Sequence, residues 1–212
     1  MNKYSVVILV VVVLSAATMA NASMLDQVVD GRSLYQDVRA WGGSVHQTAD
    51  QTADSTLVGT LSDGGWGDKT IGCPVLEFET DGSVSGQGST RAILHLYLTQ
   101  PGSDSSGGGI TLSYGQGNGS IEYGDTGGTA IASVDPAVAG WQSIDVSQAV
   151  QAAEDGNWPW LRLTLTPEQS GDQIYVASVE NVGFEPFVAI PEPATTALVA
   201  LSGLAMIRRR KV

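Results

Sequence analysis

The sequence predicts an all-β protein whose body is an antiparallel β-sandwich with one short helix. Only 15% of the 212 residues are charged, whereas glycine occurs 26 times. This balance favours short strands joined by turns over long helices. In residues 91–99 (RAILHLYLT), every second residue from Ala92 to Leu98 is apolar, and the positions between them are mixed. One face of such a strand belongs to a core and the other to a surface, as in a two-layered sandwich.

Residues 1–22 have the three parts of a secretory signal peptide. Lys3 gives a basic start, residues 6–14 (VVILVVVVL) form an apolar run, and Ala20-Asn21-Ala22 supplies the small residues of a cleavage site. The apolar run is long enough for a signal helix and too short to span a bilayer. We therefore expect signal peptidase to cleave before Ser23, and the length favours a single body domain, residues 23–189.

The body contains several segments of strand composition, each bounded by turn residues. In residues 74–80 (PVLEFET), Leu76 and Phe78 alternate with glutamates, and Asp81-Gly82 follows as a turn signal. Residues 24–40 stay open between strand and helix, and the tandem QTAD pair at 47–54 is interpreted as a loop or strand edge. The predicted strands are residues 55–61, 74–80, 91–99, 110–114, 120–123, 161–166, 174–179 and 187–190.

One internal helix is predicted, over residues 148–155. Ser147 can cap its first turn, Val146 and Val150 can face the core, and Gly156 can end it. Cys73 is the single cysteine of the chain, so no intramolecular disulfide can form and the fold must rely on its core. We expect this thiol to be buried and inert.

The C-terminal residues 190–212 combine a proline motif, an apolar helix and a basic end. Residues 194–207 hold no charge, and about 14 helical residues reach roughly 21 Å, short of the ~30 Å hydrocarbon core. Arginines can snorkel and extend the effective span, and the positive-inside rule keeps them cytoplasmic with the body outside. The residues before and after this short hydrophobic helix are Pro191, Glu192, Pro193 and Arg208, Arg209, Arg210, Lys211.

This tail resembles the PEP-CTERM sorting signal of Gram-negative bacteria that make exopolysaccharide, and all three parts of that signal are present in order. The resemblance implies recognition by exosortase, a transpeptidase-like enzyme of the inner membrane. It also implies cleavage near Pro191-Glu192-Pro193 and release toward the outer cell surface or the extracellular matrix, so that the inner membrane is a transient anchor. The alternative is a permanent single-pass anchor.

The body shows a second resemblance, to DNRLRE-type domains. It is carried by PVLEFET, by RAILHLYLT, by residues 141–150 (WQSIDVSQAV) and by the closing segments 175–180 and 186–188. The resemblance covers most of residues 52–190 and implies a jelly-roll β-sandwich related in shape to carbohydrate-binding modules. The chain departs from that pattern in its glycine-rich middle, where typical members have a longer segment that contains tryptophan.

Charge and motifs exclude several classes of function. Residues 23–190 carry a formal charge of −16, which repels phosphate backbones, so we expect no nucleic-acid partner. His46 and His95 belong to no catalytic motif, and no HExxH, GxSxG or Cys/His cluster occurs. Glu77 and Glu79, about 7 Å apart along one strand, are interpreted as a solvated face rather than as a glycosidase pair. We expect neither an enzyme nor a cofactor.

Tryptophans supply the sharper functional hypothesis, which is sugar binding. Trp66 lies in a glycine-rich loop, and Trp158 and Trp160 flank Pro159, so their ring faces are candidates for stacking on sugar C–H surfaces. The alternative for each is packing, with Trp66 as a plug at one end of the sandwich. Trp141 precedes a strand-like block and is expected in the core.

Acidic turns supply a metal hypothesis. Asp63, Asp68 and Asp81 lie in glycine-rich turns that can converge on a structural calcium ion. No EF-hand pattern occurs, so the sequence assigns no metal ligands.

Together these observations predict an exported, non-enzymatic surface or extracellular-matrix protein with a structural or adhesive role. The first alternative is a carbohydrate-binding module for extracellular polysaccharide, and the second is a small glycoside-active enzyme. An exposed row of aromatics on one sheet face favours glycan binding, and a smooth polar surface favours a matrix spacer. A cleft with two converging carboxylates favours an enzyme.

Overall fold

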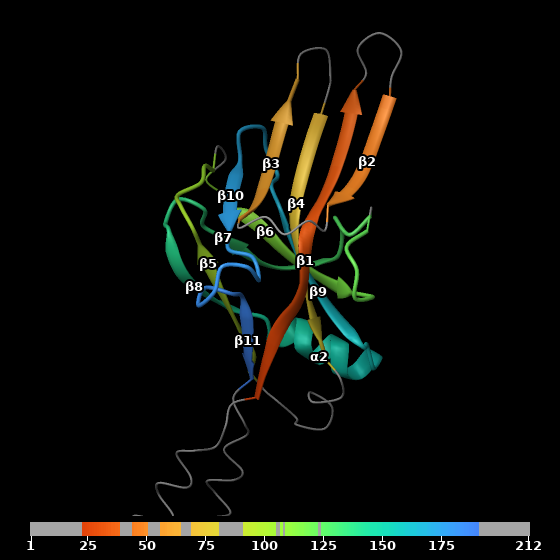
Figure 1. Cartoon of the computed structure of the whole chain (residues 1–212), viewed down its shortest axis with the longest axis vertical. Coiled ribbons are helices and arrows are strands. Elements are labelled where there is room, and N and C mark those ends of the chain that lie inside the picture. The colour runs from red at the N-terminus through yellow and green to blue at the C-terminus, as the bar shows by residue number, and fades with distance from the viewer. Residues whose placement is uncertain are drawn as a thin grey trace, which may run out of the picture.

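The protein is described here by a computed structural model of the chain (Figure 1). It describes residues 23–38, 44–50, 56–64, 69–80, 91–104, 107, 109–122 and 124–190, and for residues 23–50 it describes the backbone. The predicted signal peptide (residues 1–22) and all of the predicted tail after Ile190 lie outside these residues. Within them, no helix is long and apolar enough to cross a membrane.

The described residues form antiparallel strands and one short helix, so the predicted all-β class is confirmed. The elements are β1 (Ser23–Val38), β2 (Ser44–Asp50), β3 (Leu57–Asp63), β4 (Lys69–Glu79), β5 (Ile93–Leu98), β6 (Ile110–Gln116), β7 (Thr129–Val134), β8 (Gly140–Asp145), α2 (Ser147–Gly156), β9 (Trp160–Thr166), β10 (Gln173–Val176) and β11 (Phe187–Ile190).

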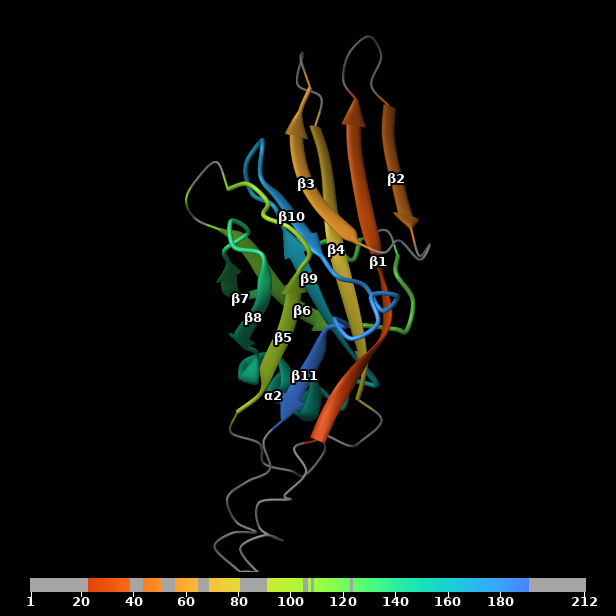
Figure 2. The same cartoon turned by 60° about the vertical axis from the view of Figure 1, so that its left-hand side comes forward.

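All the strands belong to one sheet that curls on itself like a half-barrel. Its order is β2-β1-β11-β5-β10-β3-β4-β9-β6-β7, β8 adds to the other edge of β5, and β1 also pairs with β4. β5 with β8, β10 and β11 forms one layer, and β4 with β9, β6 and β7 forms the other (Figures 1 and 2). β1 joins them, because residues 23–26 pair with β11 and residues 27–37 pair with β4.

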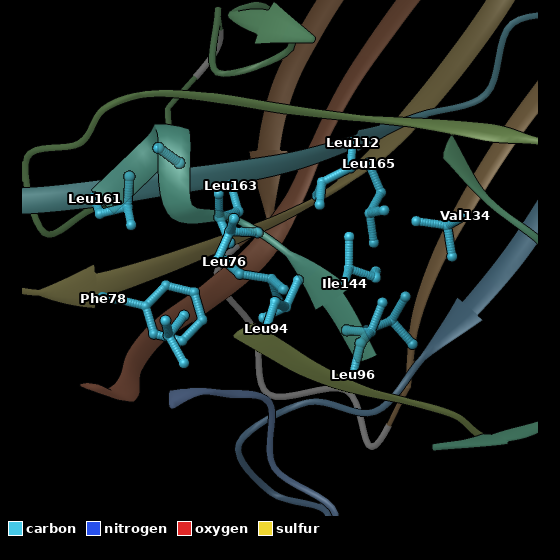
Figure 3. Close-up of a cluster of buried hydrophobic side chains, with 14 of the residues drawn as sticks. Leu76, Phe78, Leu94, Leu96, Leu112, Val134, Ile144, Leu161, Leu163 and Leu165 are labelled. Atoms are coloured by element: carbon cyan, nitrogen blue, oxygen red, sulfur yellow. The ribbon is translucent and has the colours of Figure 1, made fainter. Parts of the chain in front are cut away.

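The core lies between these two layers, and both contribute large apolar side chains (Figure 3). Leu94, Leu96 and Leu98 of β5 are fully buried, and they face a second set that includes Leu76 and Phe78 of β4. The predicted buried face of residues 91–99 is therefore confirmed. The remaining large, fully buried side chains are Ile110, Leu112, Leu161, Leu163, Leu165, Ile174 and Ile190.

Helix α2 lies at the lower end of the layers in Figure 1 and packs beside β9 and β6. Val146 and Val150 are buried as predicted, but the predicted cap is wrong. The N-cap residue is Val146, whose side chain makes no cap hydrogen bond, and the Ser147 N–H donates to Asp145 Oδ1 (2.9 Å). The Ser147 hydroxyl instead accepts a hydrogen bond from the Ala92 backbone N–H (2.9 Å), which ties the helix to the start of β5. The helix ends at Gly156, and Asn157 follows in the left-handed conformation (φ 48°).

Three further segments differ from the sequence-based assignment or complete it. Residues 24–40, which the sequence left open, contain most of β1, and the first QTAD unit lies in the edge strand β2. The strand predicted at residues 120–123 is wrong: Ile121 and Glu122 lie outside any strand, in a turn where the Glu122 N–H donates to the Asp125 carboxylate (2.6 Å). Strand β7 was not predicted, because its sequence TAIASV is neither strongly apolar nor alternating.

The substitution Leu96→Asp tests the buried face of β5. Leu96 has no exposed surface, so an aspartate there places a charge in the core without a partner, at a cost of roughly 3 kcal/mol or more. We expect loss of the cooperative thermal transition measured by circular dichroism and loss of soluble protein. Thr129→Asp, on an exposed β7 position, is the matched control and should melt like the unmodified chain. Unchanged melting of the Leu96 variant would contradict the strand assignment.

Candidate functional site: an exposed aromatic platform

Trp158 and Trp160, two of the predicted sugar-binding residues, are both half-buried. Trp158 packs against the core, with its ring centroid 6.4 Å from that of Tyr114. Trp160 opens β9, and its indole lies so close to Gly119 that a Cβ there would come within 2.9 Å of the ring. These contacts fit the packing alternative, and sugar binding by either ring stays a prediction. Trp66 lies outside the described residues.

Trp141 was expected in the core, and this expectation is wrong. Its side chain is 47% exposed. Ile144 and Val146 are buried, so the alternation of β8 turns Trp141 and Ser143 to the outer face of the sheet. The register places Trp141 opposite Tyr97 of β5. The large ring therefore lies on the outer surface of the layer made by β8, β5 and β11.

Aromatic side chains gather around Trp141 on this outer surface, and we call the group the aromatic platform. Tyr97 contacts Trp141 edge to face, with centroids 5.4 Å apart and planes at 70°. Phe184, which is 43% exposed, packs over Tyr97 at 4.3 Å. Phe187 of β11 lies 5.9 Å from Trp141 and stacks on His95 at 4.6 Å. The platform consists of His95, Tyr97, Trp141, Phe184 and Phe187.

Polar groups lie within the platform as well as at its margin. His95 of β5 is paired with Ser143 of β8, and the His95 Nδ1 and Ser143 Oγ atoms are 3.2 Å apart. Within the described residues, the other ring nitrogen of His95, Nε2, has no hydrogen-bond partner. Hydrogen-bonding groups beside exposed rings can recognise a ligand that has both hydroxyl groups and apolar C–H faces.

The loop between β10 and β11 positions Phe184 by its own hydrogen bonds. The Ser178 N–H donates to Asn181 Oδ1 (2.8 Å), and the Phe184 N–H donates to the Asn181 carbonyl (2.8 Å). Gly183 has a φ of 86°, which a residue with a Cβ rarely adopts, and its N–H donates to Glu185 Oε2 (2.6 Å). The ring therefore sits on a loop with a defined backbone rather than on a loose chain segment.

The carboxylates Glu77 and Glu79 have different environments, although both occur on the same face of β4. Glu79 is exposed, but Glu77 is completely buried, so the prediction of a solvated face is wrong for Glu77. The turn after β6 covers it: the Gly119 N–H donates to Glu77 Oε2 (2.6 Å) and the Asn118 N–H to Oε1 (3.4 Å). Glu77 therefore holds a turn against the sheet.

Charged neighbours complete this second polar cluster. Arg162 of β9 is paired with Glu77 in the register, forms an ion pair with Asp125, and donates to the Gly127 carbonyl (3.1 Å). Burial raises the pKa of Glu77 above its ordinary value of 4.5, and the N–H groups of Gly119 and Asn118 offset part of that effect. Because burial is the largest of these effects, folding favours the protonated form of Glu77.

Of the three aspartates in the calcium hypothesis, only Asp63 lies within the described residues. Asp63 is exposed at the end of β3, and its N–H donates to Ser170 Oγ (3.2 Å), whereas Asp68 and Asp81 lie outside the description. No group of three or more His, Cys, Asp or Glu side chains there could hold a metal ion. Cys73 is buried as predicted, and burial raises its pKa to about 11, which keeps the thiol protonated at neutral pH.

Comparison with known proteins does not assign a family. No family model matches the chain, and no curated protein matches it.

The substitution Glu77→Gln tests the buried carboxylate. A raised folded-state pKa contributes stability that is present below the unfolded-state value and is lost as pH rises through the folded-state value. Glutamine does not ionise, so the glutamine variant does not lose this stability as pH rises. The free energy of unfolding of the variant, minus that of the unmodified chain, should therefore increase between pH 5 and pH 7. Urea unfolding at pH 5, 6 and 7 measures the difference. Glu79→Gln, on the exposed neighbour, should show no such trend, and a flat difference for Glu77→Gln would contradict the assignment.

Proposed function

We propose that the chain is an exported, non-enzymatic protein of the cell surface or extracellular matrix that binds polysaccharide through the aromatic platform. The observation that carries this proposal is the row of partly exposed aromatic side chains on one sheet face. A sugar ring offers C–H groups that pack on aromatic faces and hydroxyl groups that bond to polar neighbours, and the platform provides both kinds of partner.

The cost of leaving these rings exposed supports a binding role. Trp141 and Phe184 each leave more than two fifths of their surface accessible, although the same layer buries every inward side chain of β5. Contiguous exposed apolar surface on a folded protein often marks a binding site. The rings also contact one another, so the platform presents one connected surface instead of isolated side chains.

The resemblances of the sequence are consistent with this role. A jelly-roll arrangement related to carbohydrate-binding modules is our finer proposal for the curled antiparallel sheet. The buried state of Glu77 argues against Glu77 and Glu79 acting together on a substrate, because the turn at residues 117–119 covers one of them. The proposal therefore includes no catalytic step.

Export and sorting form the second part of the proposal. We propose cleavage by signal peptidase before Ser23 and by exosortase near Pro191-Glu192-Pro193. Strand β1 begins at Ser23, β11 ends at Ile190, and these two residues pair with each other. In this register the two proposed cleavage sites lie side by side, at one end of the folded body. The expected product is a folded body at the outer cell surface or in the matrix, with the inner membrane only a transient anchor.

The substitution Trp141→Ala tests the platform. We expect affinity for a bound polysaccharide to fall about tenfold, which corresponds to roughly 1.4 kcal/mol for the loss of one aromatic contact. Affinity electrophoresis of the full chain in gels that contain soluble polysaccharides measures it. Val138→Ala removes an exposed apolar side chain outside the platform and is the matched control. Equal retardation of both variants would contradict the proposed surface.

Replacing Pro191-Glu192-Pro193 with three alanines tests the sorting step. We expect the unprocessed chain to accumulate in the inner membrane, since the proposed recognition motif is lost. Fractionation of the host cells, followed by mass measurement of the chain, reads out both the location and the cleavage. Normal processing and release of this variant would count against the sorting proposal and leave the glycan proposal untouched.

A further inference from the structure

We infer that the aromatic platform binds a single, uncharged polysaccharide chain, and that it discriminates against acidic polysaccharides and against the flat faces of crystalline ones. This inference rests on the proposed function and specifies its ligand class. Two independent observations carry it: the charge of the protein around the platform and the angles between the aromatic rings.

The net charge of the body and the acidic residues of the loop that carries Phe184 are unfavourable for an anionic ligand. Residues 23–190 carry a formal charge of −16, and the loop that carries Phe184 contributes Glu180 and Glu185. Sugar acids carry a carboxylate on many of their residues, so such a polymer would be repelled from this surface. Neutral sugars do not experience this repulsion.

The positive charge of Arg91 does not cancel this repulsion of anionic ligands. Arg91 lies just before β5 on the outward-facing alternation, near Asp145 at the end of β8. Hydrogen bonds from Ser147 hold the pKa of Asp145 below its ordinary value, and the positive charge of Arg91 lowers it further. Among the described side chains, the other cations are Lys69 and Arg162, which lie on β4 and β9 of the opposite layer. The described side chains therefore place no cluster of cations on the platform that could bind carboxylates.

The angles between the aromatic rings determine which shape of ligand the platform can bind. Trp141 is inclined by 70° to Tyr97 and by 64° to Phe187, so these two rings meet it edge to face. Phe184 is inclined to Trp141 by only 33°, at a centroid distance of 6.4 Å. A flat crystalline face needs several coplanar rings, whereas the two most exposed rings of this platform, Trp141 and Phe184, are tilted by 33° to each other. The pair fits the side of one chain, and Tyr97 and Phe187 act as positioning residues that hold Trp141.

His95 and Ser143 give the platform a way to recognise hydroxyl groups. The contact between His95 Nδ1 and Ser143 Oγ (3.2 Å) and the stacking of the imidazole on Phe187 fix the ring of His95. Its Nε2 atom, the Ser143 hydroxyl and the Tyr97 hydroxyl are polar groups on the platform strands. A hydroxyl-rich neutral polymer satisfies such groups, whereas an apolar protein surface would leave them without partners.

The test uses the full chain, purified in mild detergent, and three classes of probe. Soluble neutral probes are hydroxyethyl cellulose and galactomannan, acidic probes are alginate and polygalacturonate, and the flat probe is crystalline cellulose. We expect the neutral probes to bind at least tenfold more tightly than the acidic ones at 20 mM salt, with no measurable binding to crystalline cellulose. At 500 mM salt the Debye length falls to about 4 Å, so the gap between neutral and acidic probes should narrow.

Five variants connect the binding to the platform. Trp141→Ala and Phe184→Ala should each weaken binding of the neutral probes about tenfold, whereas Val138→Ala should leave it unchanged. Circular dichroism of each variant checks that the body remains folded. Tyr97→Phe keeps the ring that holds Trp141 and should retain binding, whereas Tyr97→Ala should weaken it.

The possible outcomes separate this inference from the proposed function. Acidic probes that bind as tightly as neutral ones, or tight binding to crystalline cellulose, would overturn the inference and leave polysaccharide binding in place. Absence of binding to every probe would overturn both. If the chain is instead a dimer by light scattering and Trp141→Ala makes it a monomer, the occupant of the platform is a second copy, and the inference is wrong.

Discussion

The alternation of side chains along β5 is the constraint on which both the core and the platform depend. Leu94, Leu96 and Leu98 occupy the centre of the core and have no exposed surface. Because side chains of a strand alternate with a period of two, this burial forces His95 and Tyr97 to the outer face. A shift of one residue would exchange the two sets and remove both the core and the platform. The site therefore inherits its geometry from the most strongly determined strand of the fold.

The outer faces of the two layers differ. The outer face of β4 is covered, whereas the outer face of β5 is partly accessible to a ligand. On β4, both faces are buried, because the turn at residues 117–119 covers Glu77 and is held by its carboxylate. On β5, the outer face has no such cover among the described residues, and its rings contact one another and partly remain accessible. The layer of β4 thus uses a buried carboxyl group to fasten a turn, while the layer of β5 keeps a surface open.

Much of the fold was predictable from local patterns, and the platform was not. The alternation in residues 91–99 and the apolar positions Val146 and Val150 correctly identify β5 and one face of α2. The prediction that Trp141 lies in the core depends on the hydrophobicity of its segment. Its actual orientation follows from Ile144, which packs in the core beside Leu94. The signal that was overlooked is the alternation of Trp141, Ser143 and Asp145 with Ile144 and Val146.

Other parts of the site require contacts between distant segments, which no local pattern contains. Phe184 comes to Tyr97 from a loop, and Phe187 comes to His95 through the pairing of β11 with β5. No local pattern indicates that the turn near Gly119 covers Glu77, because Glu77 lies in β4 and Gly119 lies in the turn after β6. Predictions at Trp158 and Trp160 relied on residue type alone, and the contacts of both rings turn out to be largely internal.

The mutual contacts of the platform also bear on how it can bind. Loss of side-chain freedom on binding costs about 0.5–1.5 kcal/mol for each flexible side chain that becomes ordered. Trp141 is held by Tyr97 and Phe187, and Phe184 by Tyr97 and a hydrogen-bonded loop, so much of this cost is already met on folding. A flexible polysaccharide must still lose its own freedom, which limits the affinity of any one platform. Many weak contacts along a polymer that carries repeated binding sites would then give firm attachment through multivalency. The proposed adhesive role needs only such a preformed surface on each copy, whereas capture of a single small sugar would need a tighter site.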